Sequence, residues 1–223
     1  MRMLRYLLAA TVLAVPAAAA AQGEPVTVPA AAASGDLSFA RVYASPSLNG
    51  PVPREVKLSP DGRFLTLLRG RADDHEQYDL WGYDRTTGQW SMLVDSRKLG
   101  SGKDLSEAEK MQRERLRIGD LKGIVSYTWS ADSQSILVPL DGDLFLAKLD
   151  GTATRLTDTS EGELNPALSP LGGHVSFVRD RRLWTGKVGA EAAPVTPQEA
   201  AEAVHWGEAE FVAQEEMDRH TGY

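Results

Sequence analysis

The sequence predicts an all-β protein: a partial β-propeller of about three four-stranded blades, with a helical insertion and a signal peptide in front. Two observations favour the propeller. A Ser-containing turn recurs before alternating apolar segments, and two of its copies, at Ser130 and Ser169, lie 39 residues apart. A propeller blade occupies roughly 40–45 residues, so this spacing fits one blade per repeat. A third observation, one segment of helical periodicity between the first two copies, predicts the insertion.

The first 22 residues have the pattern of a secretory signal. Arg2 and Arg5 are basic, residues 7–15 are apolar, and small residues precede Gln22. This order of basic, apolar and small residues is typical of a cleaved signal peptide. The sequence therefore predicts export, to the periplasm or outside the cell, and the Ala/Pro-rich residues 23–35 predict a flexible leader.

The remainder, 36–223, is predicted to be the incomplete propeller. The repeated turns are Ser59-Pro60-Asp61-Gly62, Ser130-Ala131-Asp132-Ser133 and Ser169-Pro170-Leu171-Gly172. Each is followed by a strand and then by a segment of a charged residue, Leu and an aromatic: Asp79-Leu80-Trp81, Asp143-Leu144-Phe145 and Arg182-Leu183-Trp184. Tight turns at Gly88, Gly151 and Gly189 then introduce a further strand. Three copies that agree in order and chemistry indicate repeated blades rather than unrelated hairpins.

The insertion covers about 104–119. Ser106 and Glu109 form a capping box, which predicts a helix from Glu107 to Ile118. On a helical wheel one side carries Ala108, Met111, Leu116 and Ile118. Arg115 falls within that arc, whereas Arg113 and Arg117 fall outside it. A guanidinium on the packing face needs an acceptor or a ligand oxygen, or else its stem crosses the apolar stripe with the charge in water.

Composition and motifs exclude several functions. The net charge of −7 and the lack of a Lys/Arg-rich run argue against nucleic acid or anionic lipid as a partner. There is no cysteine, and the four histidines lack helical pair spacing, so we expect no metal site and no cofactor. No apolar run is long enough to span a membrane. The sequence has no Gly-x-Ser-x-Gly, so the nucleophile motif of an α/β-hydrolase is missing.

The adjacent carboxylates Glu215 and Glu216 are the strongest candidate binding residues. Two neighbouring carboxylates repel each other, and a bound ammonium would relieve that repulsion. The simpler alternative is that both side chains face water, as most glutamates do.

Taken together, these residues resemble the amino-terminal region of bacterial dipeptidyl peptidase IV, in the S9 prolyl oligopeptidase clan. The resemblance extends from about Leu37 to Tyr223 and depends on the propeller turns, the inserted Gln-Arg-Glu-Arg-Leu-Arg-Ile and the Gln-Glu-Glu-Met segment. It implies an eight-bladed propeller that caps an α/β-hydrolase domain. It also implies that Glu215 and Glu216 bind the free amino terminus of a peptide. An arginine beside them contacts a substrate carbonyl; Arg115 matches best, with Arg113 second and Arg71 a further candidate.

The resemblance implies an exported serine peptidase that removes X-Pro or X-Ala dipeptides. The chain is then truncated before the Ser/Asp/His domain and recognises substrate without cleaving it. Its partners would be peptides with a free amino terminus, the hydrolase domain and, in a homodimer, a second copy. The alternative is a non-catalytic secreted propeller that binds protein or peptide. An in-frame continuation encoding more blades and a Gly-x-Ser-x-Gly would favour the peptidase.

Overall fold

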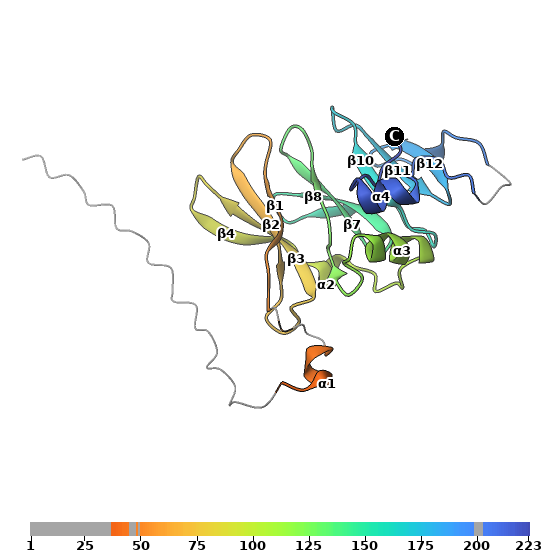
Figure 1. Ribbon diagram of the computed structural model, residues 1–223. Helices are drawn as coiled ribbons and strands as arrows, with labels where there is room; N and C mark the ends of the chain where they lie inside the picture. Colours follow the sequence, from red (N-terminus) through yellow and green to blue (C-terminus); the bar gives the residue numbers. More distant parts are fainter. Residues whose placement is uncertain (1–36, 45–47, 49, 199–202) are drawn as a thin grey trace, which may run out of the picture. The chain divides into compact units, whose positions relative to one another are not determined.

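Three antiparallel sheets, each with its main strands in sequence order, follow one another along the described chain between Arg54 and Pro194 (Figure 1). The computed structural model describes residues 37–44, 48, 50–198 and 203–223. The predicted signal peptide, 1–22, and leader, 23–35, lie outside the described residues. All elements described below belong to one compact unit, Phe39–Tyr223.

Each sheet is built from four strands that follow one another along the chain. The first contains β1 (Arg54–Leu58), β2 (Phe64–Gly70), β3 (Gln77–Asp84) and β4 (Gln89–Val94), with β5 (Lys122–Gly123) added parallel to β3. The second contains β6 (Thr128–Trp129), β7 (Ser135–Leu140), β8 (Asp143–Lys148) and β9 (Ala153–Arg155). The third contains β10 (Leu164–Leu168), β11 (His174–Arg179), β12 (Arg182–Lys187) and β13 (Ala193–Pro194). The predicted set of three four-stranded blades is confirmed.

The repeated turn joins the first two strands of each of the three described blades and keeps one side-chain hydrogen bond each time. The seryl Oγ accepts from the backbone N–H five residues later, at 2.9 Å in the first turn and 3.0 Å in the other two. The fourth turn position has a positive φ: +70° at Gly62, +59° at Ser133 and +69° at Gly172. Glycine adopts this conformation without a Cβ clash, which explains its place in two of the three copies. Ser133 is the exception, and its Oγ accepts a 3.0 Å hydrogen bond from Asp61 N of the first blade.

The middle sheet is buried on both faces. Ile136 and Val138 of β7 belong to the apolar core shared with the first blade, whereas Leu137 packs with Val175 and Phe177 of the third. Successive strand residues point to opposite faces, so an unbroken apolar run serves two cores. This is how stacked blades bury surface that one blade could not bury alone.

Four short helices are described: α1 (Phe39–Val42), α2 (Ser96–Leu99), α3 (Glu107–Arg115) and α4 (Phe211–Glu216). The predicted cap of α3 is confirmed, because Ser106 Oγ accepts from Glu109 N at 3.2 Å. The helix ends three residues before the predicted Ile118, since Arg117 adopts a left-handed φ of +56°. In the described part of the chain, none of the helices has the length and apolarity needed to cross a membrane.

The predicted packing face of α3 is wrong. Of its four apolar residues only Ile118 is buried, and Met111 is 51% exposed. Arg113, predicted to lie outside that face, is 5% exposed. The reason is electrostatic: Arg113 Nη2 lies 2.9 Å from Glu109 Oε1, so a polar face becomes neutral enough to bury.

Candidate functional site

The helix α4 presents the predicted glutamate pair to solvent. Its N-cap is Glu210, whose carboxylate accepts from Val212 N and Ala213 N, each at 2.7 Å. Ala213 is buried, whereas Glu215 and Glu216 are exposed. No hydrogen bond or ion pair to another described residue engages either carboxylate. Both are therefore available to a ligand.

Arg115 reaches α4 from the insertion, 99 residues earlier in the chain. Its Nη1 donates to Gln214 Oε1 at 3.0 Å, and its Nη2 to Met111 Sδ at 3.1 Å. The guanidinium also lies over the Phe211 ring, 5.4 Å from the centroid. The structure thus places Arg115 against the short helix that carries both predicted glutamates.

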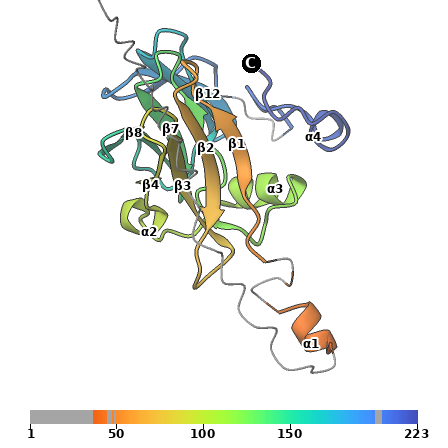
Figure 2. The same cartoon turned by 90° about the vertical axis from the view of Figure 1, so that its left-hand side faces the viewer.

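The two helices lie on one side of the blades. Figure 2 shows α3 and α4 on the side of the first sheet where β1 lies, opposite the β4 edge. First strands of all three blades, represented by Glu55, Thr128 and Asn165, line a cavity of about 330 Å³ together with α3 residues. The first strands of the three blades therefore border the cavity next to α3.

Arg113, the second arginine candidate, is directed inward. Besides its ion pair with Glu109, its Nη1 donates to Leu121 O at 3.0 Å. Burial raises the pKa of Glu109 above its usual value, even though Arg113 acts in the opposite direction. The contacts of Arg113 within the described residues hold α3 to the following loop and do not reach α4.

Arg71, the third candidate, belongs to the first blade. Its Nη2 lies 2.8 Å from Asp79 Oδ1 and also contacts Asp95. In the second blade, Arg155 pairs with Asp143, which occupies the same place in the repeated segment. Arg71 therefore compensates a buried carboxylate of the blade, and the interactions of the described residues do not bring it to α4.

Asn165 joins the insertion to the end of the described chain. Its side chain accepts from Gln112 Nε2 at 2.6 Å and donates to His220 O at 3.0 Å. Its carbonyl accepts from Tyr223 Oη at 2.6 Å. Asn165 has a φ of +50° within a bulge of β10, a conformation that asparagine tolerates better than most residues. Sequence reasoning missed Asn165, although an asparagine beside Pro166 is a signal for irregular backbone.

Gln214, directly before the two carboxylates, is a further residue of the site that the sequence does not single out. It is 7% exposed, and its Nε2 donates to Ala209 O at 2.6 Å. A cavity of about 420 Å³ lies between α3, α4 and the β11–β12 turn, and it is lined by Arg115 and Gln214. Both side chains thus sit at the boundary between helix packing and open space.

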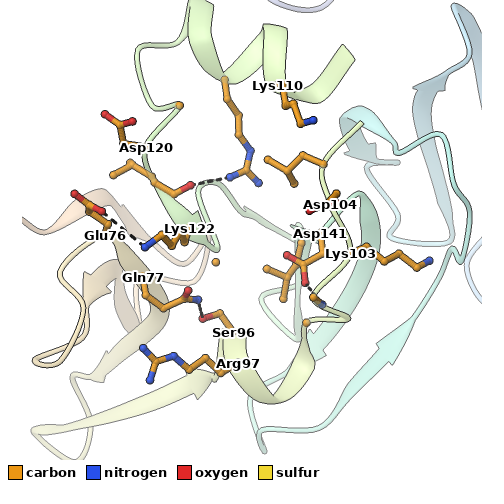
Figure 3. A pocket seen from close by; sticks show the side chains of 18 of the residues that line it. Glu76, Gln77, Ser96, Arg97, Lys103, Asp104, Lys110, Asp120, Lys122 and Asp141 are labelled. Carbon is orange, nitrogen blue, oxygen red and sulfur yellow. Dashed lines mark hydrogen bonds and ion pairs between the residues drawn. The ribbon is translucent and has the colours of Figure 1, made fainter. Parts of the chain in front are cut away.

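A larger cavity, of about 1080 Å³, lies on another side of α3 (Figure 3). Its lining mixes cations with carboxylates: Arg97, Lys103, Lys110, Lys122, Glu76, Asp104, Asp120 and Asp141. These four cations are already paired, with Asp73, Asp158, Glu107 and Asp74 respectively, and Arg113, which also lines the cavity, is paired with Glu109. Because each of these cations is already compensated by a carboxylate, this cavity is a weaker candidate than the exposed glutamates.

A family model of known proteins matches the last part of the chain. Residues 159–223 match the family model described as "Dipeptidyl peptidase IV (DPP IV) N-terminal region". The match covers all four strands of the third blade and all of α4, including Glu215 and Glu216. Residues 159–223 are thus similar to the N-terminal region of dipeptidyl peptidase IV. The resemblance stated from the sequence is confirmed over this segment.

Three solved structures are similar at low identity. They are a putative TolB from Agrobacterium tumefaciens (18% identical, TM-score 0.45), TolB from Acinetobacter baumannii (20%, 0.40) and dipeptidyl peptidase 4 from Porphyromonas gingivalis (18%, 0.47). The alignments cover 66%, 62% and 75% of this chain. They span 50%, 30% and 23% of the other chains, respectively. This chain therefore spans half or less of the length of those proteins.

Proposed function

We propose that the chain is the amino-terminus-recognising propeller region of an exported serine dipeptidyl peptidase that removes X-Pro or X-Ala dipeptides. One observation carries the proposal. Arg115, from the insertion, contacts the α4 helix, which carries two exposed adjacent carboxylates that pair with no other residue the structure describes. That helix lies within the segment that matches the dipeptidyl peptidase IV N-terminal region.

The chemistry of the three side chains suits the end of a peptide. An α-amino group has a pKa of about 7.7–8.0, so much of it is protonated at neutral pH. Glu215 and Glu216 would favour the charged form and accept its N–H donors. Arg115 keeps N–H groups beyond those used by Gln214 and Met111, and these would donate to a substrate carbonyl. Because the glutamates would hold the amino group and Arg115 a backbone carbonyl close to it, the peptide would bind at a fixed number of residues from its amino terminus.

Cleavage itself would belong to an α/β-hydrolase domain with a Ser/His/Asp triad and an oxyanion hole. In that arrangement the present chain orients the peptide and restricts access to the triad. Export is supported by the signal-like pattern of residues 1–22. The hydrolase domain and a second copy of the protein are the proposed macromolecular partners.

The proposal is tested by titrating the full chain with the tripeptide Ala-Pro-Ala and with its N-acetylated form in a calorimeter. We expect the free amine to bind and the acetylated form to bind at least about 100-fold more weakly, because acetylation removes a charge that is hydrogen-bonded to two carboxylates. Glu215→Gln with Glu216→Gln should weaken binding of the free amine to a similar degree.

The matched control is Glu114→Gln with Glu191→Gln, which removes two exposed charges elsewhere. It should bind as the wild type does. Unchanged affinity in the Glu215/Glu216 variant would contradict the proposal. With a hydrolase domain attached, that variant should lose X-Pro turnover while the catalytic serine still reacts with a fluorophosphonate; a non-catalytic binding module would show no such reaction.

A further inference from the structure

Gln214 joins the two helices of the candidate site through a single side-chain amide. Its Nε2 donates to Ala209 O at 2.6 Å, and its Oε1 accepts from Arg115 Nη1 at 3.0 Å. The two ends of the amide are not interchangeable here. A flipped amide would place an N–H against the guanidinium and an oxygen against a carbonyl, and both contacts would repel. Ala209 therefore fixes the direction in which Gln214 presents its acceptor.

The other contacts of Arg115 are weaker guides to its orientation. Met111 supplies a thioether sulfur, which is a poor acceptor, and Phe211 supplies a ring face, which attracts the cation over a broad area. The amide oxygen of Gln214 is the directional acceptor among these three. The orientation of the Arg115 guanidinium thus depends chiefly on Gln214.

Arg115 differs from the other two candidate arginines because its partner, the side-chain amide of Gln214, is uncharged. Arg113 is paired with the carboxylate of Glu109, and Arg71 with those of Asp79 and Asp95. Those carboxylates compensate the charge of their arginines. An amide holds a guanidinium in place without neutralising it, so Arg115 keeps its positive charge for another group.

We propose that Gln214 is a positioning residue that aims the charged Arg115 guanidinium at the substrate carbonyl, at a fixed distance from Glu215 and Glu216. The inference rests on the proposed function, and it adds a residue that acts only through Arg115. The ammonium subsite, formed by the two glutamates, does not need Gln214.

The test is a double-mutant cycle on the full chain, with Ala-Pro-Ala and n-butylamine as probes in calorimetric titrations. Gln214→Ala should weaken tripeptide binding about tenfold, as expected for the loss of a hydrogen bond to a charged group. Arg115→Ala should weaken it at least as much, and the double variant no further, because the two residues act as one unit. Butylamine has no carbonyl, so Gln214→Ala should change its affinity less than twofold.

The matched control is Gln112→Ala, which removes another glutamine amide that bridges α3 and the third blade but does not touch Arg115. It should retain tripeptide affinity within twofold. Equal losses in Gln112→Ala and Gln214→Ala, or additive losses in the double variant, would overturn the inference and indicate general loosening.

A measurement without peptide separates this inference from the proposed function. The side-chain ¹⁵N–¹H signals of Arg115 should show hindered rotation in the wild type and averaging in Gln214→Ala. Identical signals in both would overturn the inference even if the glutamates bind the amine. If Glu215→Gln with Glu216→Gln leaves binding of both probes unchanged, the proposed function fails, whatever the arginine signals show.

Discussion

The repeated turns and the pair of site helices are built on opposite principles. In each turn a serine and its partner lie five residues apart, and the same Oγ contact recurs three times at 2.9–3.0 Å. The site helices α3 and α4 occur once each, and their contact joins Arg115 to Gln214 across 99 residues. The turns are thus formed by residues close in sequence and occur in three copies, whereas the site is formed by residues far apart in sequence and occurs once among the described residues.

This difference separates the part of the molecule that stabilises the blades from the part to which we assign recognition. A turn held mainly by hydrogen bonds between residues close in sequence can be repeated without changing function. A site made from non-repeated segments depends on the blades to hold these segments together. Substitutions confined to one region therefore separate the two roles.

The largest effect on stability is expected at Arg113. Arg113→Met leaves the mostly buried Glu109 without its cation, which should lower the free energy of unfolding by about 3 kcal/mol. Arg115→Met removes a guanidinium at a partly exposed position and should cost less than about 1 kcal/mol. Urea denaturation of both variants gives the two values. An equal loss of unfolding free energy in the two variants would contradict the assignment of Arg113 to stability and of Arg115 to ligand binding.

A smaller, graded effect is expected within the repeat. Ser59→Ala leaves the N–H of the buried Phe64 without its acceptor and should cost about 2 kcal/mol. Ser169→Ala frees the N–H of the exposed His174, which water can satisfy, so the loss should stay below about 1 kcal/mol. Thermal and urea unfolding measure both, with the exposed Ser91→Ala as the control. If Ser169→Ala costs more stability than Ser59→Ala, burial of the N–H group does not decide how much each turn contributes.

The smallest effect concerns pH and the loop between the second and third blades. Burial raises the pKa of Glu163, although the Thr157 and Thr159 hydroxyls donate to it at 2.6 and 2.7 Å. The folded state therefore holds this proton more tightly than the unfolded state, whose carboxyl titrates near 4.5. Its contribution to stability is full below that pH and is lost as pH rises through the folded pKa.

Glu163→Gln removes this titration, so the free energy of unfolding should fall less between pH 4.5 and pH 8 than in the wild type. Urea titrations at several pH values compare the two slopes. The exposed Glu191→Gln should keep the wild-type slope. A slope in Glu163→Gln as steep as that of the wild type would assign the pH dependence to other groups.

Much of the fold could be predicted from the sequence because its signals are local. Ser59, Ser130 and Ser169 each bond within their own turn, and Ser106 caps α3 within four residues. The packing face of α3 could not be predicted from apolar residues. Burial of Arg113 depends on Glu109 one helical turn away and on a carbonyl of Leu121 in the following loop.

The candidate site divides in the same way. The sequence alone pointed to Glu215 and Glu216 and favoured Arg115 over Arg113 and Arg71. The tertiary structure decided that Arg115 contacts α4, that Arg113 is buried beside Glu109, and that Gln214 and Asn165 join the segments. The physical reason is range: turns and caps satisfy their hydrogen bonds within a few residues, whereas a contact across 99 residues exists only after the blades have packed.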